Sequence, residues 1–131
     1  MKIQNLDHIG VFSSDLDRSV RFYCENLGFS LKSRQQGTRA DGSTFWMAFI
    51  ANGSCEIELV EPPKGYEAKD GTVCHIALSA DDADAAFRFL KARGVNVEWD
   101  APRTEDFFRL GLKHFFFRGP DNERLEICQK L

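Results

Sequence analysis

Two stretches of the chain carry apolar residues at the spacing of an amphipathic helix. The apolar stripes are Leu16, Val20, Tyr23 and Leu27 in the first stretch and Ala83, Phe87 and Leu90 in the second. A glycine that can end a helix follows each stripe, at Gly28 and Gly94. The pattern therefore predicts one helix in each half of the chain.

Polar residues mark where each helix begins. Ser13 and Ser14 are candidates for the first N-cap. Acidic residues then follow where the helix dipole favours them, at Asp15 and Asp17 in the first stretch and at Asp81 and Asp82 in the second. We expect these acids to lie in the first turns and to have no part in a site.

Alternating and apolar runs bounded by turn residues predict strands around both helices. The expected strands are 3–12, 29–36, 44–50 and 54–61 in the first half, and 72–79, 95–100, 113–118 and 124–129 in the second. The stretch 101–112 is long for a loop and fits no element, and long loops often carry binding function. Each half thus reads as strand, helix, strand, strand, strand.

The two halves are also similar in sequence. His8 and His75 lie 67 positions apart (75 − 8 = 67), and at this offset Ile9 meets Ile76 and Asp15 meets Asp82. The chain of 131 residues is long enough for one domain. We therefore predict a single domain, 1–131, built from two βαβββ modules, 3–61 and 72–131.

Two histidines and two glutamates occupy corresponding positions in this repeat. His8 and His75 come from the first strands, and alternation places Glu58 and Glu126 on the polar faces of the last strands. Imidazole nitrogens and carboxylate oxygens are ligands for Zn, Ni, Co, Mn or Fe, and two carboxylates balance a divalent ion. The joint pattern predicts a divalent metal site, and the sequence does not choose among these metals.

Other chemistry-bearing residues have plainer interpretations. His114 has no counterpart in the repeat and reads as an exposed or hydrogen-bonded strand residue. The four cysteines form no Cys-x-x-Cys pair and are expected to be small buried thiols.

Composition excludes several classes of partner. The net charge is −3, without a basic patch, so nucleic acid is not expected. No apolar run is long enough to cross a bilayer, and the first residues lack the apolar core of a signal peptide. We expect a cytoplasmic protein that acts on a small molecule and does not bind a membrane.

The segments LDHIGVFSSDLDRSVRFYCENLGF, CEIELVEP, VCHIALSADDADAAFRFL and FFFRGPDNERLEI resemble the vicinal oxygen chelate superfamily over nearly the whole chain. This resemblance implies an α+β fold in which two βαβββ modules form a cup-shaped mixed sheet around a metal. The ligand set His, Glu, His, Glu is similar to that of glyoxalase I and falls on His8, Glu58, His75 and Glu126. A homodimer is implied as well, in which a site takes its ligands from one chain or from two.

The glyoxalase-like resemblance implies a lyase or isomerase that moves a proton next to a carbonyl through a metal-bound enediolate, as with the thiol hemithioacetal of an α-ketoaldehyde. Glu126 and Glu58 are then the candidates for the proton-carrying base, and Glu126 is slightly preferred. Phe12 and Pro62 stand where glutathione-using glyoxalases have Arg and Asn, which argues against glutathione as the thiol.

Two alternatives share the expected fold. One is an epimerase of the methylmalonyl-CoA type, which uses related enolate chemistry. The other is a non-catalytic protein that binds a small molecule and confers resistance to it. Members of that second class generally lack the metal ligands, so the full set of four argues for an enzyme.

Overall fold

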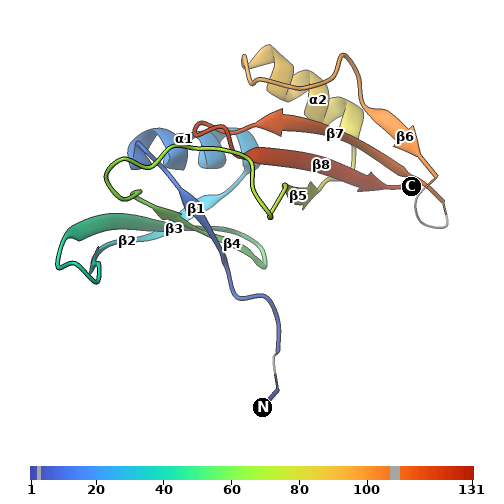
Figure 1. The fold of residues 1–131 in the computed structure, drawn as a ribbon. Helices are drawn as coiled ribbons and strands as arrows, with labels where there is room; N and C mark the ends of the chain where they lie inside the picture. Colours follow the sequence, from blue (N-terminus) through green and yellow to red (C-terminus); the bar gives the residue numbers. More distant parts are fainter. Residues whose placement is uncertain (3, 107–109) are drawn as a thin grey trace. The chain divides into compact units, whose positions relative to one another are not determined.

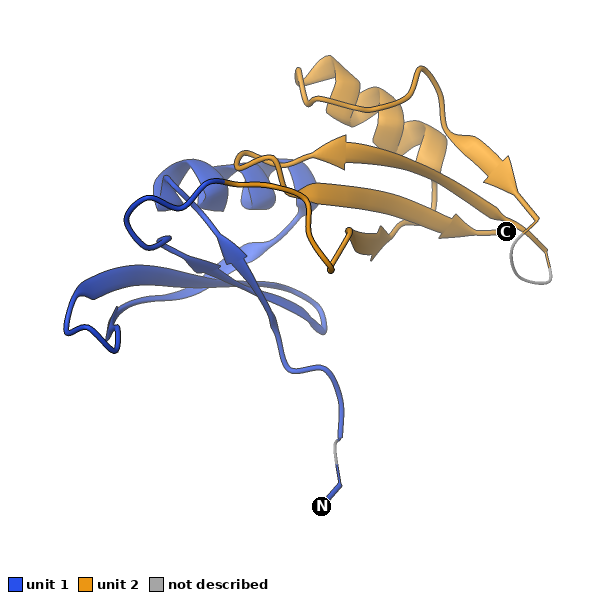
Figure 2. Cartoon of the chain, in the orientation of Figure 1, with its two compact units in different colours: residues 1–67 blue, residues 68–131 orange. Residues whose placement is uncertain are grey.

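The computed structural model describes residues 1–2, 4–106 and 110–131, and the chain divides into two compact units, 1–67 and 68–131 (Figure 2). Each unit contains one helix and one four-stranded mixed sheet, which confirms the predicted α+β class and the two βαβββ modules. None of the helices in the described residues is long and apolar enough to span a membrane.

The first unit runs from β1 to β4 (Figure 1). Its elements are β1 (Ile9–Phe12), α1 (Leu16–Leu27), β2 (Ser30–Thr38), β3 (Thr44–Asn52) and β4 (Cys55–Val60). The strand order is β1-β4-β3-β2, with β1 parallel to β4 and the other pairs antiparallel. The first strand of the module therefore lies beside its last.

The second unit repeats this topology. Its elements are β5 (Ile76–Ser79), α2 (Ala83–Ala92), β6 (Arg103–Glu105), β7 (Leu112–Arg118) and β8 (Arg124–Lys130). The strand order is β5-β8-β7-β6, again with the first and last strands parallel. The chief difference is the edge strand, which has nine residues in β2 and three in β6.

In each unit the helix covers one face of the sheet and leaves the other face for polar chemistry. The buried apolar residues on the helix side of the central strands alternate along them, and they are Ala48, Ile50, Ile57 and Leu59 in the first unit and Phe115, Phe117, Leu125 and Ile127 in the second. Tyr23 of α1 and Leu90 of α2 are buried as well, as their stripes predict. Because strand residues alternate, Glu58 and Glu126 point away from the helices.

The N-cap residues of the helices differ from the expectation, because acids expected in the first turn are themselves the caps. Asp15 is the N-cap of α1, where its Oδ1 accepts from the Arg18 N–H at 3.0 Å, and Asp82 caps α2 in the same way through Ala85 at 2.9 Å. Ser13 is buried instead, and its Oγ lies 2.7 Å from Ser19 Oγ. An ionised carboxylate accepts only, so it suits the free N–H groups at a helix start.

The first helix ends as the sequence predicts. Gly28 has φ +71°, a left-handed conformation that glycine adopts without steric cost. The Phe29 N–H then donates to the Tyr23 carbonyl at 3.2 Å, and the two rings meet edge to face at 5.6 Å.

The strand predicted at 95–100 is wrong. This segment makes only an isolated bridge between Val97 and Phe117, while β6 forms farther on, inside the stretch 101–112. The bridge is made by the Glu98 N–H, which donates to the Phe116 carbonyl, and by the Arg118 N–H, which donates to the Asn96 carbonyl, each at 2.9 Å. Pro102, which has no N–H to donate to a ladder, separates this segment from β6. Residues 107–109 of that stretch lie outside the described part of the chain.

Both first strands begin later than expected, because β1 starts at Ile9 and β5 at Ile76. His8 and His75 are thus the residues immediately before their strands. The predicted run 3–12 includes residue 3, which lies outside the description.

Candidate functional site: two histidine–glutamate pairs

The first pair joins His8 to Glu58. In the parallel register of β1 and β4, Gly10 lies opposite Glu58, and His8 precedes Gly10 by two residues, which places it on the same face. His8 Nε2 lies 3.3 Å from Glu58 Oε2. On its other side the His8 Nδ1–H donates to Asp7 Oδ2 at 2.8 Å, and the ring meets Phe49 edge to face at 5.6 Å.

The second pair joins His75 to Glu126 by the same construction. Ala77 lies opposite Glu126 in the parallel register of β5 and β8, and His75 precedes Ala77 by two residues. His75 Nε2 lies 3.1 Å from Glu126 Oε2, and the ring meets Phe116 edge to face at 5.2 Å. The neighbour of His75 Nδ1 is the Cys74 thiol, whose Sγ lies 2.9 Å away.

The donor atoms of each pair are placed as ligands of one ion would be. Two N or O ligands about 2.1 Å from the same ion stand roughly 3.0 to 3.4 Å apart in octahedral or tetrahedral geometry. Both Nε2···Oε2 separations fall in this range. In addition, Asp7 accepts a hydrogen bond from His8 Nδ1, and a carboxylate on the far ring nitrogen is the usual outer partner of a metal-bound histidine.

Electrostatics favour the charged form of His8 in the absence of a metal. The hydrogen bond to Asp7 raises the pKa of His8 above its usual value; partial burial opposes this, and the Glu58 carboxylate adds to the rise. A proton on Nε2 competes with a metal for the same lone pair. Metal binding through His8 is therefore expected to release a proton.

The structure thus brings His8 together with Glu58 and His75 together with Glu126, in separate units. Within 1–2, 4–106 and 110–131, no group of three or more His, Cys, Asp or Glu side chains forms a metal site by itself. Each unit supplies two of the four predicted ligands.

His114 is the member of the second unit that sequence reasoning did not single out. It is buried in β7, and its Nδ1 lies 2.5 Å from Glu126 Oε1. The expectation of a hydrogen-bonded strand residue was right in kind, but the partner is a predicted metal ligand. The available signal was its position in the alternation, since His114 shares a face with Phe116, which lies opposite Glu126.

Cys74 also differs from the expectation of a buried thiol. All four cysteines are free, and three are partly buried, whereas Cys74 is exposed. Its contact with His75 makes it part of the surroundings of the second pair.

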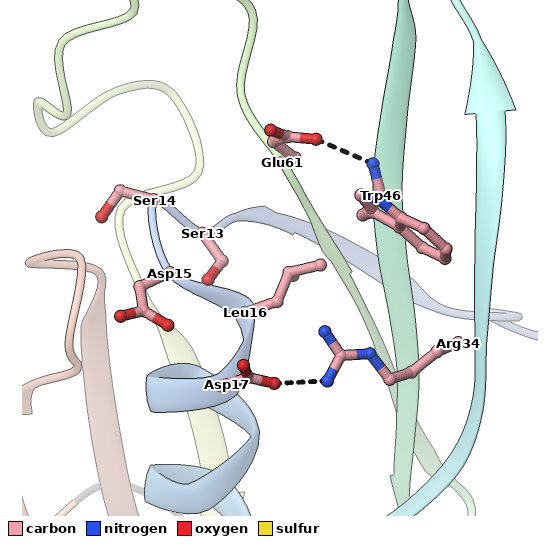
Figure 3. Close-up of a pocket in the computed structure, with 8 residues that line it drawn as sticks. All are labelled: Ser13, Ser14, Asp15, Leu16, Asp17, Arg34, Trp46 and Glu61. Atoms are coloured by element: carbon pink, nitrogen blue, oxygen red, sulfur yellow. Dashed lines mark hydrogen bonds and ion pairs between the residues drawn. The ribbon is translucent and has the colours of Figure 1, made fainter.

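A separate hollow lies on the helix side of the first sheet, and Figure 3 shows its side chains. Its volume is about 180 Å³, and it is lined by Ser13, Ser14, Asp15, Leu16, Asp17, Arg34, Trp46 and Glu61. Arg34 is paired with Asp17, and Glu61 Oε2 accepts from the Trp46 backbone N–H at 2.8 Å. Asp15 accepts from the Arg18 N–H, so each charged side chain of the hollow already has a partner, and the hollow lies on the opposite face from Glu58.

Comparison with known proteins gives one matching family and several similar chains. The family model described as Glyoxalase/Bleomycin resistance protein/Dioxygenase superfamily matches residues 5–127. The uncharacterized protein YwbC of Bacillus subtilis (strain 168) is 32% identical over 97% of this chain and 98% of its own length. A probable lactoylglutathione lyase of Vibrio parahaemolyticus is 31% identical, covering 88% of this chain and 83% of its own length.

Solved structures of the same fold include proteins with different roles. TnmS3, an antibiotic-binding protein from Streptomyces sp. CB03234, superimposes with a TM-score of 0.73 at 25% identity, over 100% of this chain and 99% of its own. The fosfomycin resistance protein FosX from Listeria monocytogenes, complexed with Mn(II) and sulfate, has a TM-score of 0.73 at 19% identity, over 99% and 95%. At that identity the FosX likeness supports the fold alone.

Proposed function

Because the chain belongs to the Glyoxalase/Bleomycin resistance protein/Dioxygenase superfamily, also known as the vicinal oxygen chelate superfamily, we propose that it is a metal-dependent lyase or isomerase of the glyoxalase I type. The observation that carries the proposal is the pair of matched Nε2···Oε2 separations, 3.3 and 3.1 Å, on the helix-free faces of the two sheets. Both fit the spacing of two ligands on one divalent ion.

The four ligands in this proposal are His8, Glu58, His75 and Glu126. A site with all four ligands combines one His8–Glu58 pair with one His75–Glu126 pair, and the two pairs come either from one chain or from two copies of it. We propose a homodimer on the basis of the family resemblance. Light scattering of the metal-free and metal-loaded protein tests this, because a chain that stays monomeric when loaded would exclude a site shared between copies.

A divalent ion bound by these residues supplies Lewis acid chemistry, which polarises a substrate carbonyl. Glu126 or Glu58 takes a proton from the carbon beside that carbonyl and returns it to the neighbouring carbon, so the glutamate is regenerated. Asp7 and Cys74 contact the Nδ1 atoms of His8 and His75 and leave each Nε2 directed at its glutamate. Phe49 and Phe116 pack against the two imidazoles and limit their rotation.

The substrate in this proposal is a small carbonyl compound, such as the hemithioacetal of an α-ketoaldehyde with a thiol other than glutathione. Phe12 stands where a guanidinium would hold glutathione, and it packs on Tyr66 with ring centroids 4.5 Å apart. Both rings are partly exposed, so they offer an apolar contact in place of an anion contact. This favours a thiol partner with an apolar portion.

Metal analysis of the purified protein comes first, followed by assays. We expect a stoichiometric transition metal or uptake of Zn²⁺, Ni²⁺ or Mn²⁺, and a melting temperature that falls with chelator. Methylglyoxal with several thiols, then methylmalonyl-CoA, should be tested with Glu126→Gln as the control. A chain that neither contains nor takes up metal would reject the enzyme proposal.

A second candidate is a non-catalytic binding protein, favoured by the likeness to the antibiotic-binding TnmS3. The two functions differ in their dependence on the glutamates. Ligand binding that survives both Glu58→Gln and Glu126→Gln, in a chain without metal, would support the binding protein. The epimerase alternative is tested by exchange of the α-proton of methylmalonyl-CoA with solvent. An epimerase shows this exchange and does not convert a hemithioacetal to a thioester, as a glyoxalase-type enzyme would.

A further inference from the structure

The two glutamates are held very differently. In the second unit both oxygens of Glu126 have partners, since Oε2 lies 3.1 Å from His75 Nε2 and Oε1 lies 2.5 Å from His114 Nδ1. Glu126 and His114 are only 6% and 7% exposed. In the first unit, among the described residues, His8 is the only side chain paired with Glu58, whose side chain is 21% exposed.

The strand register explains why this contact exists in one unit only. In β7 and β8, Phe116 lies opposite Glu126, and His114 is the next residue along β7 on the same face. In β3 and β4, Phe49 lies opposite Glu58, so the corresponding residue is Met47. A thioether has no hydrogen to donate, so Met47 cannot anchor a carboxylate as the imidazole N–H does.

The imidazole is oriented to donate. An ionised carboxylate only accepts, so His114 Nδ1 carries the hydrogen in this bond. His114 Nε2 is buried and has no hydrogen-bond partner in the described residues, so nothing draws the proton to that side. Trp99 and Phe116 meet the imidazole edge to face at 5.1 and 5.7 Å and keep it in place.

We infer that His114 is a positioning residue that anchors Glu126 through Oε1 and leaves Oε2 for the metal and for proton transfer. This inference rests on the proposed function. A glutamate that served both as a metal ligand and as a base would use the same oxygen for both, and a carboxylate anchored at its other oxygen pivots about that bond and stays within reach. Among the described residues Glu58 has no such anchor, which favours Glu126 as the proton-carrying glutamate.

The test compares three variants with the wild type. His114→Met installs the residue found at the corresponding position of the first unit and removes the donor. His114→Gln keeps an N–H donor of similar reach. Met47→Leu is the matched control at the same register in the other unit. Circular dichroism and thermal melting of each variant exclude general unfolding as the cause of any change.

The first measurement needs no metal and no substrate. In the metal-free wild type labelled with ¹⁵N-histidine, the His114 Nδ1–H proton should resonate far downfield, because it is hydrogen-bonded to a carboxylate. It should be observable because burial protects it from exchange with water. It should be missing in His114→Gln and should move upfield in Glu126→Gln. A wild-type protein without this resonance would overturn the anchor.

The second measurement is the affinity for Zn²⁺ alone, by competition with a chromophoric chelator. We expect His114→Met to lose about 10- to 100-fold, the usual effect of removing a partner of a metal ligand. His114→Gln should recover most of this, and Met47→Leu should match the wild type. If His114→Met binds Zn²⁺ as the wild type does, or if His114→Met and His114→Gln lose affinity equally, the positioning role of His114 is overturned while the proposed function stands. A wild type that binds no Zn²⁺ overturns the proposed function as well.

Discussion

The two units build the same histidine–glutamate pair from the same parts and support it differently. In both, a histidine just before the first strand meets a glutamate of the last strand across a parallel register, and a phenylalanine packs edge-on against the imidazole. The first unit supports its histidine with the Asp7 carboxylate, whereas the second gives His75 only a thiol. The second unit anchors its glutamate with His114, where the first has Met47.

Strong support therefore falls on the histidine in one unit and on the glutamate in the other. The shared parts fix where the paired atoms lie, and the differing parts decide which side chain of each pair has a further partner. A duplicated module can thus keep its geometry while the surroundings of its two copies differ.

The most damaging change to either pair is the loss of its histidine. His8→Ala and His75→Ala should each weaken Zn²⁺ binding by more than about 100-fold, beyond the effect of losing an outer partner. Isothermal titration of Zn²⁺ into the metal-free proteins measures this. If one of the two variants still binds Zn²⁺ as the wild type does, the two pairs are not equivalent in metal binding.

The outer partners of the histidines should be unequal. Asp7→Ala removes a carboxylate and should weaken Zn²⁺ binding about 10-fold, whereas Cys74→Ala removes a weak thiol partner and should cost less. The same Zn²⁺ competition assay compares them. Cys74→Asp, which copies the first unit, should bind more tightly than the wild type, and weaker binding would show that a carboxylate at this position does not support His75 as Asp7 supports His8.

The units also differ at their edges, where the short β6 is accompanied by a charged clamp. Glu98 binds both Arg118 and Arg124, and these hydrogen bonds hold the pKa of Glu98 below its usual range. A lowered carboxyl pKa stabilises the fold above the unfolded-state value, near 4.5, and the contribution is lost as pH falls through the folded-state value. Glu98→Gln should therefore cost about 1 to 2 kcal/mol at pH 7.

Urea unfolding at pH 7 and at pH 3 measures this effect, and the difference between variant and wild type should shrink at the lower pH. Asp17→Asn is the matched control in the first unit, because it breaks the exposed Asp17–Arg34 pair. Exposed pairs and first-turn acids contribute little, so we expect a loss below about 1 kcal/mol from it, smaller than that of Glu98→Gln. A Glu98→Gln difference that persists undiminished at pH 3 would contradict the role of the carboxylate charge.

The helix N-caps are a feature in which the two units should agree, and their loss is the smallest effect that we expect to measure. Asp15 and Asp82 cap their helices with nearly the same backbone angles, φ −146° and −142°, and the same acceptor geometry. Asp15→Ala and Asp82→Ala should each cost about 1 kcal/mol. Chemical denaturation compares them, and clearly unequal losses would show that the repeat does not extend to the energetics of the caps.

Much of the fold was predictable because the helix and strand patterns of the sequence occur in both halves of the chain. The offset of 67 between His8 and His75 aligns the modules, and strand alternation alone places Glu58 and Glu126 on the faces opposite the helices. Which residues pair within each unit follows once the first and last strands are parallel neighbours, a relation that the strand pattern itself does not specify.

What could not be predicted depends on contacts between distant segments. The segment 95–100 has the residues of a strand, but in the described part of the chain it meets β7 through an isolated bridge, and β6 forms the ladder beside β7. The link from His114 to Glu126 requires the antiparallel register of β7 and β8. A repeat comparison passes over His114, since it marks only what the two copies share.

The parallel pairing of β1 with β4 and of β5 with β8 also bears on how the chain is made. Each histidine is near the start of its module and each glutamate near the end, so a histidine–glutamate pair closes only after almost the whole module has been synthesised. Contacts between such distant residues are slow to form, because the intervening chain must be ordered first. A growing chain therefore exposes each histidine without its glutamate, and the pair exists only in a finished module.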